Sequence, residues 1–519
     1  MRDFQSPGRS AAISANGMVA TSHPDAARIG LEILQEGGSA ADAAVAASAV
    51  MAVAEPQNAG LGGDTFYMHC DGAGAVAAYN GSGRTPRALD AEAVGAVGLD
   101  SVHAVTVPGA VDALLRLHAD HGRLPLDRLL APAIALARDG WLVQPRVAWD
   151  WQFSQERLAR SETARRHWAR AVKPGSRIVD PALARTLEAI VAGGREAFYE
   201  GEIAESIVRT LQRLGGYHRL EDFAFHRGEP VEPIRTAYRG LDILECPPNG
   251  QGITVLMMLN MLSGLNMPAV WRDMTGYVHL LAQVSQLGYG ARDHWVCDPD
   301  FASVPLATLL SPGMAADLRG RLDPERAIVP APFDMPEHKD TVYLACVDRD
   351  GNAVSFINSI FTDFGSAIHD EASGILLHNR GASFSAAAGH PNAIAPGKRP
   401  MHTIIPGLAM KAGKPVMPFG VMGGHYQATG QVQLLSAMLD AGLDPQEALE
   451  LPRHFAFGGR LEIERGVPDT VADMLAAKGH DVFRAARPMG GGQAIWIDHD
   501  EGVLIGGSDP RKDGYALGY

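Results

Sequence analysis

Two helical segments are predicted near the start of the chain, each marked by its own boundary residues. Apolar residues recur at helical spacing over residues 25–35, and the glycine pair at 37–38 ends this first segment. Ser39 and Asp42 then form a capping-box pattern ahead of a run of alanines and valines that reaches residue 54. Because the second segment is apolar nearly all round, we expect a buried helix.

Further along the chain, helical patterns give way to paired strands. Residues 111–215 are predicted to be mostly helical, whereas residues 341–347 and 353–361 predict two strands joined by the turn Asp-Arg-Asp-Gly-Asn. Further strand pairs are predicted at 402–411 with 416–421 and at 493–498 with 502–507, with helices at 430–442 and 468–479. Antiparallel hairpins with helices between them indicate an α+β fold in which helices cover sheets.

The composition indicates a folded protein and excludes several functional classes. Of the 519 residues, 46% are hydrophobic and 20% are charged, which suits one large composite domain or two domains. A net charge of −14 argues against nucleic acid as a partner, and no long apolar window predicts a membrane span. Residues 1–17 lack the apolar stretch of a secretory signal, and the four cysteines lack C-x-x-C spacing. We therefore expect a cytoplasmic protein that binds neither nucleic acid nor membranes.

No cofactor and no metal site is predicted, because the corresponding motifs are missing from the sequence. The glycine-rich segment at 58–63 has neither the P-loop pattern nor the dinucleotide fingerprint. It is predicted to be a tight turn where the backbone approaches other backbone or a ligand. His369, Asp370 and Glu371 are adjacent, so they cannot all point at one metal ion, and we expect a solvated turn there. The G-x-S-x-G nucleophile elbow is missing as well.

One segment resembles the start of a known catalytic subunit. Residues 338–355, His-Lys-Asp-Thr-Val-Tyr-Leu-Ala-Cys-Val-Asp-Arg-Asp-Gly-Asn-Ala-Val-Ser, are similar to the beginning of the small subunit in the γ-glutamyltransferase family, a branch of the N-terminal-nucleophile hydrolases. Other blocks of that family occur in order at 37–46, 60–66, 107–109, 136–140, 247–252, 398–400, 423–424 and 508–511. The resemblance therefore spans nearly the whole chain, and it implies a four-layer αββα sandwich.

The resemblance implies that the chain cuts itself between Asp340 and Thr341. Thr341 would then be a nucleophile at a new N-terminus, and its own α-amine, with a pKa of about 8, would act as its base. The products would be a large subunit, residues 1–340, and a small subunit, residues 341–519, that together form one composite domain.

The same resemblance assigns the groups that assist the nucleophile. The backbone N–H groups of Gly423 and Gly424 would form the oxyanion hole, because residues without side chains let a carbonyl oxygen approach closely. Ser359 falls where the family keeps a threonine that hydrogen-bonds the nucleophile, and serine retains that hydroxyl. The alternative for Ser359 is a role in packing alone.

The residues that bind the glutamate part of the substrate in transpeptidases of the family are replaced in this chain. Those enzymes carry asparagine at the position of Phe361, glutamine at Arg380 and an aspartate at Ser383 that pairs with the substrate α-ammonium group. Losing that anion and gaining Arg380 makes the pocket more positive, and a guanidinium suits a carboxylate. The alternatives are an internal salt bridge for Arg380 and core packing for Phe361.

Two further substrate contacts also differ from the family pattern. The tandem serines that hold the α-carboxylate correspond to His402 and Thr403, and the family arginine after the glycine-rich block corresponds to Ser82, with Arg84 two residues on. These changes favour an acyl group that carries a carboxylate but needs no α-ammonium group, such as a glutaryl or oxamate amide.

The sequence leaves three functions to be distinguished. The first is a self-processed threonine amide hydrolase acting on a small-molecule amide. The second is a true glutathione hydrolase or γ-glutamyl transpeptidase with altered contacts, and the third is an inactive binding protein on the same scaffold. The partners expected are the two subunits of one precursor, and further dimerisation of that pair is left open.

Overall fold

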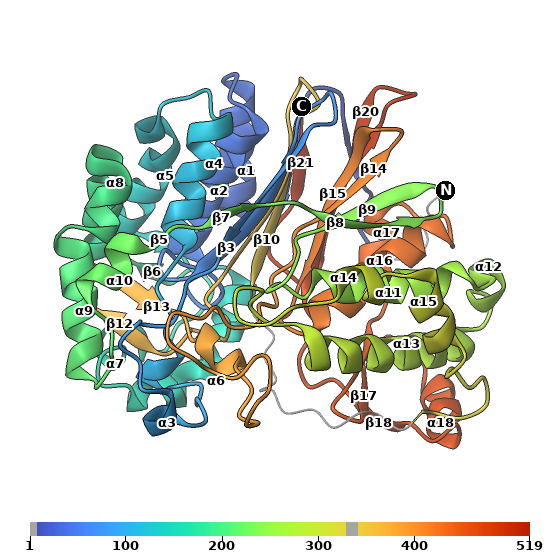
Figure 1. Ribbon diagram of the computed structural model, residues 1–519. Helices are drawn as coiled ribbons and strands as arrows, with labels where there is room; N and C mark the ends of the chain where they lie inside the picture. The colour runs from blue at the N-terminus through green and yellow to red at the C-terminus, as the bar shows by residue number, and fades with distance from the viewer. Residues whose placement is uncertain (1–7, 329–340) are drawn as a thin grey trace.

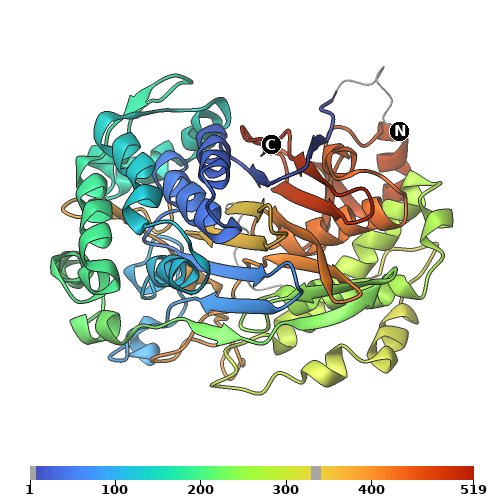
Figure 2. The ribbon, with the colours of Figure 1, turned by 90° about the horizontal axis from the view of Figure 1, so that it is seen from above.

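Two seven-stranded sheets face each other at the centre of the computed structural model, which describes residues 8–328 and 341–519. Helices cover the outer face of each sheet, so the molecule has four layers (Figure 1). Seen from above, the two helical layers lie on opposite sides of the paired sheets (Figure 2). This is the αββα arrangement that the family resemblance implies.

The strands of each sheet come from distant parts of the chain, and all neighbours pair antiparallel. The first sheet is ordered β21 (Ala516–Gly518), β2 (Met18–Thr21), β10 (Val342–Val347), β11 (Ala353–Ser359), β3 (Asp64–Cys70), β4 (Val76–Gly81) and β7 (Glu229–Val231). The second sheet is ordered β1 (Ala12–Ser14), β20 (Val503–Ser508), β19 (Gly491–Asp498), β15 (Lys414–Met422), β14 (Gly407–Lys411), β9 (Leu241–Glu245) and β8 (Ile234–Tyr238).

The two helical layers differ in which part of the chain supplies them. The first sheet is covered by helices from the N-terminal part, namely α1 (Pro24–Gln35), α2 (Ala40–Ala54), α4 (Ala110–His121), α5 (Leu126–Asp139) and α8 (Pro181–Tyr199). The second sheet is covered by α11 (Gly252–Ser263), α13 (Met274–Trp295), α16 (Tyr426–Leu439) and α17 (Pro445–Glu450). Both layers therefore bury apolar helix faces against a sheet.

Shorter elements complete the chain around these four layers. The remaining helices are α3 (Ala91–Val94), η1 (Val102–Ala104), α6 (Pro145–Arg160), α7 (Arg165–Trp168), α9 (Glu202–Arg213), α10 (Leu220–Phe225), α12 (Met267–Val270), α14 (Leu306–Leu309), α15 (Pro312–Arg319), η2 (Arg380–Ser383) and α18 (Asp469–Ala477). The small sheets are β5 (Trp141–Leu142) with β6 (Arg177–Ile178), β12 (Ile368–Asp370) with β13 (Ile375–Leu377), and β16 (His454–Phe457) with β17 (Arg460–Ile463) and β18 (Asp481–Arg484).

The predicted buried helix is confirmed in α2. All of its residues are buried, and it packs between α1, α5 and the first sheet. The capping box is present, since Ser39 Oγ accepts from Asp42 N at 3.1 Å and Asp42 Oδ2 accepts from Ser39 N at 2.9 Å. The cap fixes where α2 starts, and the apolar surface of α2 attaches the helical layer to the sheet.

The predicted hairpin at 341–361 is confirmed as β10 and β11, which lie in the middle of the first sheet. Its turn is held by Asp348, whose Oδ1 accepts from Asp350 N and Asn352 N, both at 3.0 Å. Tyr343 and Ala345 belong to the core between the two sheets. Side chains alternate along a strand, so Thr341 lies on the same face as Tyr343 and Ala345 and is directed between the sheets.

The glycine-rich segment at 58–63 is the close-approach turn that the sequence predicts. A side chain on Gly62 would lie 2.2 Å from Leu376 O, and one on Gly63 would lie 2.5 Å from Ser359 O. Only residues without a Cβ atom fit at these distances. The segment therefore supports the ends of β11 and β13 from the side.

The solvated turn expected at His369, Asp370 and Glu371 is wrong for two of the three residues. His369 and Asp370 lie in β12 with exposed fractions of 3% and 2%. Asp370 Oδ1 accepts from Ser206 Oγ at 3.0 Å and from Thr210 Oγ1 at 2.7 Å. The tertiary partners on α9 allow burial of this carboxylate, and a reading of adjacent residues alone could not detect them.

Across residues 8–328 and 341–519, no helix is long and apolar enough to cross a bilayer, and no cluster of side chains has the make-up of a metal site. The four cysteines are buried and unbridged.

Candidate active site

Thr341 lies at the beginning of a central strand, in the space between the two sheets. It directly precedes β10 and is fully buried. Its Oγ1 lies 3.2 Å from Ser359 Oγ and accepts a hydrogen bond from Gln427 Nε2, also at 3.2 Å. A hydroxyl that is contacted from two elements, β11 and α16, has a fixed direction, as a nucleophile requires.

Ser359 connects Thr341 to two residues that follow it in the chain. Its Oγ accepts hydrogen bonds from Phe361 N at 3.0 Å and from Arg380 Nη2 at 3.3 Å. Phe361 has a φ of 78°, which is unusual for a residue other than glycine, and turns the chain sharply after β11. Its ring centroid lies 4.3 Å from Arg380 Cζ, so the guanidinium stacks on the ring.

Arg380 places a positive charge beside the Thr341–Ser359 pair. It is fully buried at the start of η2, and its Nη1 donates to Thr403 Oγ1 at 2.7 Å. Burial lowers the pKa of Arg380 to about 9, although Asp64 opposes the shift, so the side chain stays protonated at neutral pH. Its Nε is buried with no hydrogen-bond partner in the part of the chain that the structure describes. The site thus contains one unpaired cationic donor.

A second buried group centres on Asp64 at the start of β3, a residue that was not identified from the sequence. Asp64 Oδ1 accepts from the backbone N–H groups of Gly83 at 3.1 Å and Gly109 at 3.2 Å. Its Oδ2 accepts from His402 Nε2 at 2.9 Å and lies 3.8 Å from His378 Nδ1. The carboxylate therefore fixes the orientation of the His402 ring.

Charges within this group decide its protonation. Burial alone would raise the pKa of Asp64, but His378, His402 and Arg380 together hold it well below its usual range. Burial, with Arg380 second, lowers the pKa of His402 to about 3. Near neutral pH, Asp64 is an anion and His402 is neutral, with its Nε2–H donating to Asp64. His402 Nδ1 is then a bare acceptor, and it has no partner among the described residues.

Gly423 and Gly424 lie between β15 and α16, shortly before Gln427, whose side chain donates to Thr341 Oγ1. Their φ angles of 116° and 59° favour glycine, and a side chain on Gly423 would lie 2.8 Å from Gly490 Cα. Gly424 O accepts from Gln251 Nε2 at 3.1 Å, which holds the segment in place. The first turn of an α-helix carries unpaired N–H groups and a partial positive charge. A negative oxygen placed against this segment would be stabilised by these groups.

Ser383, which stands where transpeptidases of the family carry an aspartate, directs its hydroxyl at the backbone. Its Oγ lies 2.9 Å from Arg380 O and 2.7 Å from Met401 O. The side chain therefore fixes η2 against the segment that leads to His402 and Thr403, and with it the position of Arg380.

Arg84 is not brought to the group around Thr341. Its guanidinium forms ion pairs with Asp298 at 3.0 Å, Asp300 at 2.6 Å and Glu229 at 3.3 Å, and its side chain is 29% exposed. Asp340, the residue before the predicted cleavage point, lies outside the described residues.

Three residues of the site were missed in the sequence: Asp64, His378 and Gln427. A signal existed for Asp64, because a charged residue begins an otherwise apolar strand directly after the glycine-rich turn. Gln427 lies in the first turn of α16, which starts at Tyr426, four residues before the helix predicted from residue 430. His378 follows β13 without any local pattern, so only the tertiary structure identifies it.

Comparison with known proteins decides the family. The sequence profile of the family Gamma-glutamyltranspeptidase matches residues 26–519. The chain belongs to this family. The resemblance inferred from the sequence motifs is thereby confirmed, and the family is one of hydrolases and transpeptidases. The chain is accordingly an amide hydrolase or acyltransferase of the Gamma-glutamyltranspeptidase family.

Relatives in the family match the chain over almost its full length. The "Glutathione hydrolase-like YwrD proenzyme" of Bacillus subtilis (strain 168) is 38% identical, covering 98% of this chain and 99% of that protein. The "Oxamate amidohydrolase proenzyme" of Klebsiella pneumoniae subsp. pneumoniae is 34% identical, again over 98% of this chain and 99% of that protein. Both relatives are named as proenzymes.

A solved member of the family has the same fold. The crystal structure of a cephalosporin acylase from Bacillus halodurans superposes with a TM-score of 0.93 at 38% sequence identity. The superposition covers 100% of this chain and 99% of that one. The predicted α+β fold of the N-terminal-nucleophile hydrolase type is therefore confirmed.

Proposed function

We propose that the chain is a self-processing N-terminal-threonine amide hydrolase whose substrate carries a carboxylate on its acyl part. The observation that carries the proposal is the position of Thr341 Oγ1, held by Ser359 and Gln427 beside the buried cation Arg380. The proenzyme names of the relatives support the processing step.

Processing uses the hydroxyl of Thr341 before its amine is free. Oγ1 attacks the carbonyl carbon of Asp340, the C–N bond breaks, and the hydroxyl proton passes to the Thr341 nitrogen. The resulting ester joins Asp340 to Oγ1, and water hydrolyses it to a carboxylate and a free hydroxyl. The new chains comprise residues 1–340 and 341–519 and stay together as one composite domain.

Turnover repeats this chemistry on an amide substrate. The free α-amine of Thr341 takes the Oγ1 proton as Oγ1 attacks the amide carbonyl, and the N–H groups at Gly423 and Gly424 receive the negative oxygen. The amine then protonates the leaving nitrogen, the C–N bond breaks, and an acyl ester remains on Oγ1. Water hydrolyses that ester and restores the enzyme.

Arg380 binds the acyl group of the substrate. Its unpaired Nε is a buried cationic donor, and a substrate carboxylate oxygen supplies the missing acceptor. The aspartate that would pair with an α-ammonium group is absent, since Ser383 occupies that place and bonds to the backbone. Glutaryl and oxamate amides fit this description, and one relative is named an oxamate amidohydrolase. Hydrolysis is favoured over transfer to an acceptor amine.

The processing step is tested by intact mass and N-terminal sequencing of the purified protein. The wild-type chain is expected to give two chains, the smaller beginning Thr-Val-Tyr-Leu. Thr341→Ala should stay whole, and Thr341→Ser, which keeps a hydroxyl, should cleave. A wild-type chain that stays single over time and pH contradicts the nucleophile and favours a binding protein on this scaffold.

The acyl preference is tested with a panel of p-nitroanilides. Glutaryl and oxamate amides are expected to be hydrolysed with a higher kcat/KM than the γ-glutamyl amide. If the γ-glutamyl amide is preferred by a wide margin, the protein is a glutathione hydrolase or transpeptidase, and Arg380 does not select the acyl group. The expected location in the cytoplasm stays a prediction of the sequence.

A further inference from the structure

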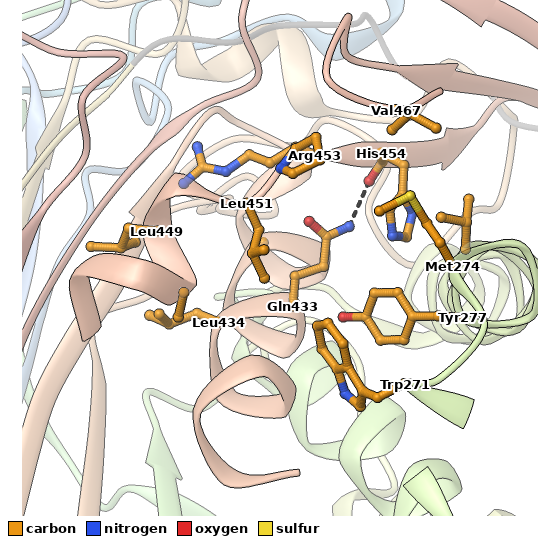
Figure 3. A pocket seen from close by; sticks show the side chains of 14 residues that line it. Trp271, Met274, Tyr277, Gln433, Leu434, Leu449, Leu451, Arg453, His454 and Val467 are labelled. Carbon is orange, nitrogen blue, oxygen red and sulfur yellow. Dashed lines mark hydrogen bonds between the residues drawn. The ribbon is translucent and has the colours of Figure 1, made fainter. Parts of the chain in front are cut away.

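A cavity lies in the outer helical layer of the second sheet (Figure 3). It encloses about 90 Å³ and is bordered by α13, α16, α17 and the start of β16. Its walls are mostly apolar and include Trp271, Leu434, Leu449 and Val467. Ser359 and Gln427, which contact Thr341, do not line it, and neither does Arg380, so the cavity is distinct from the proposed active site.

Two polar side chains that line the cavity have unused hydrogen-bonding groups, namely the His454 ring and the Tyr277 hydroxyl. His454 has an exposed fraction of 2%, and neither of its ring nitrogens has a partner among the described residues. Burial lowers the pKa of His454 to about 3, so the ring is neutral and offers one N–H donor and one acceptor. Buried polar groups in folded proteins are normally paired, so this ring points to a missing partner.

The neighbouring polar residue in the cavity does not supply that partner. Gln433 Nε2 donates to the backbone oxygen of His454 at 2.7 Å, as the dashed line in Figure 3 shows, and its Oε1 accepts from Tyr426 Oη at 2.7 Å. Both functional atoms of Gln433 are therefore used within the fold. The His454 ring and the Tyr277 hydroxyl are left as the polar groups that a ligand would meet.

Aromatic side chains flank the cavity next to this ring. The Tyr277 ring stands at 90° to the His454 ring, with centroids 5.8 Å apart, and the Trp271 and Tyr277 rings lie 4.0 Å apart. Met274 borders the cavity and is 41% exposed, so it marks the side that faces solvent. Flexible methionine and aromatic walls favour a planar apolar ligand.

We propose that this cavity binds a small aromatic molecule that carries one hydroxyl or N–H group. The ring of the ligand packs among Trp271, Tyr277 and Leu434, and its polar group bonds to a ring nitrogen of His454. A water molecule could pair with His454, but it would leave the apolar walls without contacts.

The test uses phenol and toluene as probes, which have similar shape and differ in the hydroxyl. Binding is measured by titration calorimetry on the full-length protein, with Thr341→Ala as a control that should bind phenol equally. His454→Phe keeps an aromatic ring and removes both nitrogens. It should weaken phenol binding by about tenfold, the effect of one lost hydrogen bond, while toluene binding changes little. Met274→Trp, at an exposed position, should block both probes.

Several results would overturn the proposal. They are the absence of saturable phenol binding in solution, equal phenol binding by His454→Phe, and a phenol-soaked crystal that shows only ordered water on the His454 ring. Phenol that is visible in a soaked crystal but does not bind in solution would also overturn the proposal, because it would show binding at crystal concentration only. Because Thr341→Ala is included, failure here is distinguishable from failure of the proposed catalytic function.

Discussion

At the scale of single residues, the hydroxyl of Ser359 connects Thr341, the proposed nucleophile, to Arg380, the proposed acyl-binding group. It lies 3.2 Å from Thr341 Oγ1 and accepts from Arg380 Nη2 at 3.3 Å. Removing it leaves Thr341 with one fewer orienting contact and leaves the Arg380 guanidinium held by Thr403 and the Phe361 ring. A single serine therefore contacts both the Thr341 hydroxyl and the Arg380 guanidinium.

Replacing Ser359 with alanine should slow self-cleavage and kcat by roughly 10- to 100-fold, the effect of a misdirected nucleophile. Ser359→Thr retains the hydroxyl and should stay within about threefold of wild type. The measurement is the first-order loss of the precursor band, followed by kcat on a preferred anilide. Ser355→Ala, on the same face of β11 but bonded to Tyr343 Oη at 2.8 Å, is the control. If Ser359→Ala matches wild type in both measurements, Ser359 has a role in packing alone.

Arg380 and Arg84 provide a matched pair, because both were suggested as substrate contacts and only Arg380 lies beside Thr341. Arg380→Gln should raise KM for a glutaryl anilide by roughly 10- to 100-fold, since a charge-assisted hydrogen bond is lost. Arg84→Gln removes the same charge from the Asp298 cluster and should leave KM unchanged. Steady-state kinetics on the two variants measure this, and equal losses would show that overall charge, not contact, sets affinity.

At the scale of elements, the glycine turn at 58–63 holds the end of β11 in place. A Cβ atom on Gly63 would lie 2.5 Å from Ser359 O, which is backbone and cannot move aside alone. Gly63→Ala should therefore shift Ser359, slow self-cleavage at least tenfold and cost about 1–3 kcal/mol of stability. Gly98→Ala, which has no atom within 4 Å, should match wild type in both measurements. Rapid cleavage by Gly63→Ala would show that the turn only fills space.

Elements were predictable where their signals are local. The capping box of α2 needs only Ser39 and Asp42, and the β10–β11 turn needs only residues 348–352. The family resemblance identified Thr341 and Ser359 as site residues, because the motifs of a family include residues that are distant in sequence but close in the fold. The Asp64–His402 bond joins residues 338 positions apart, so no local pattern could report it. The prediction that His369 is exposed to solvent was wrong for the same reason, since its neighbours come from other elements.

At the scale of the whole molecule, many histidines are buried as neutral rings. Among the described residues, burial lowers the pKa of eight to about 3 or 4: His23, His69, His218, His226, His369, His402, His454 and His480. Their pKa in the unfolded chain is about 6.5, so below that pH the unfolded chain binds more protons. The stability they contribute is complete above pH of about 6.5 and is lost as pH falls. The protein should therefore be acid-labile.

His369 isolates one of these contributions, because neither ring nitrogen has a partner in the described structure and it faces His167 and Trp168. His369→Phe cannot bind a proton, so between pH 7 and pH 5 it should lose about 2 kcal/mol less stability than wild type. For a chain of this length the difference is about 2 °C in the fall of Tm, measurable by differential scanning fluorimetry. His294→Phe, at an exposed position, should follow wild type. An equal fall of Tm in His369→Phe and wild type would mean that His369 takes up a proton within the fold, and that acid lability arises elsewhere.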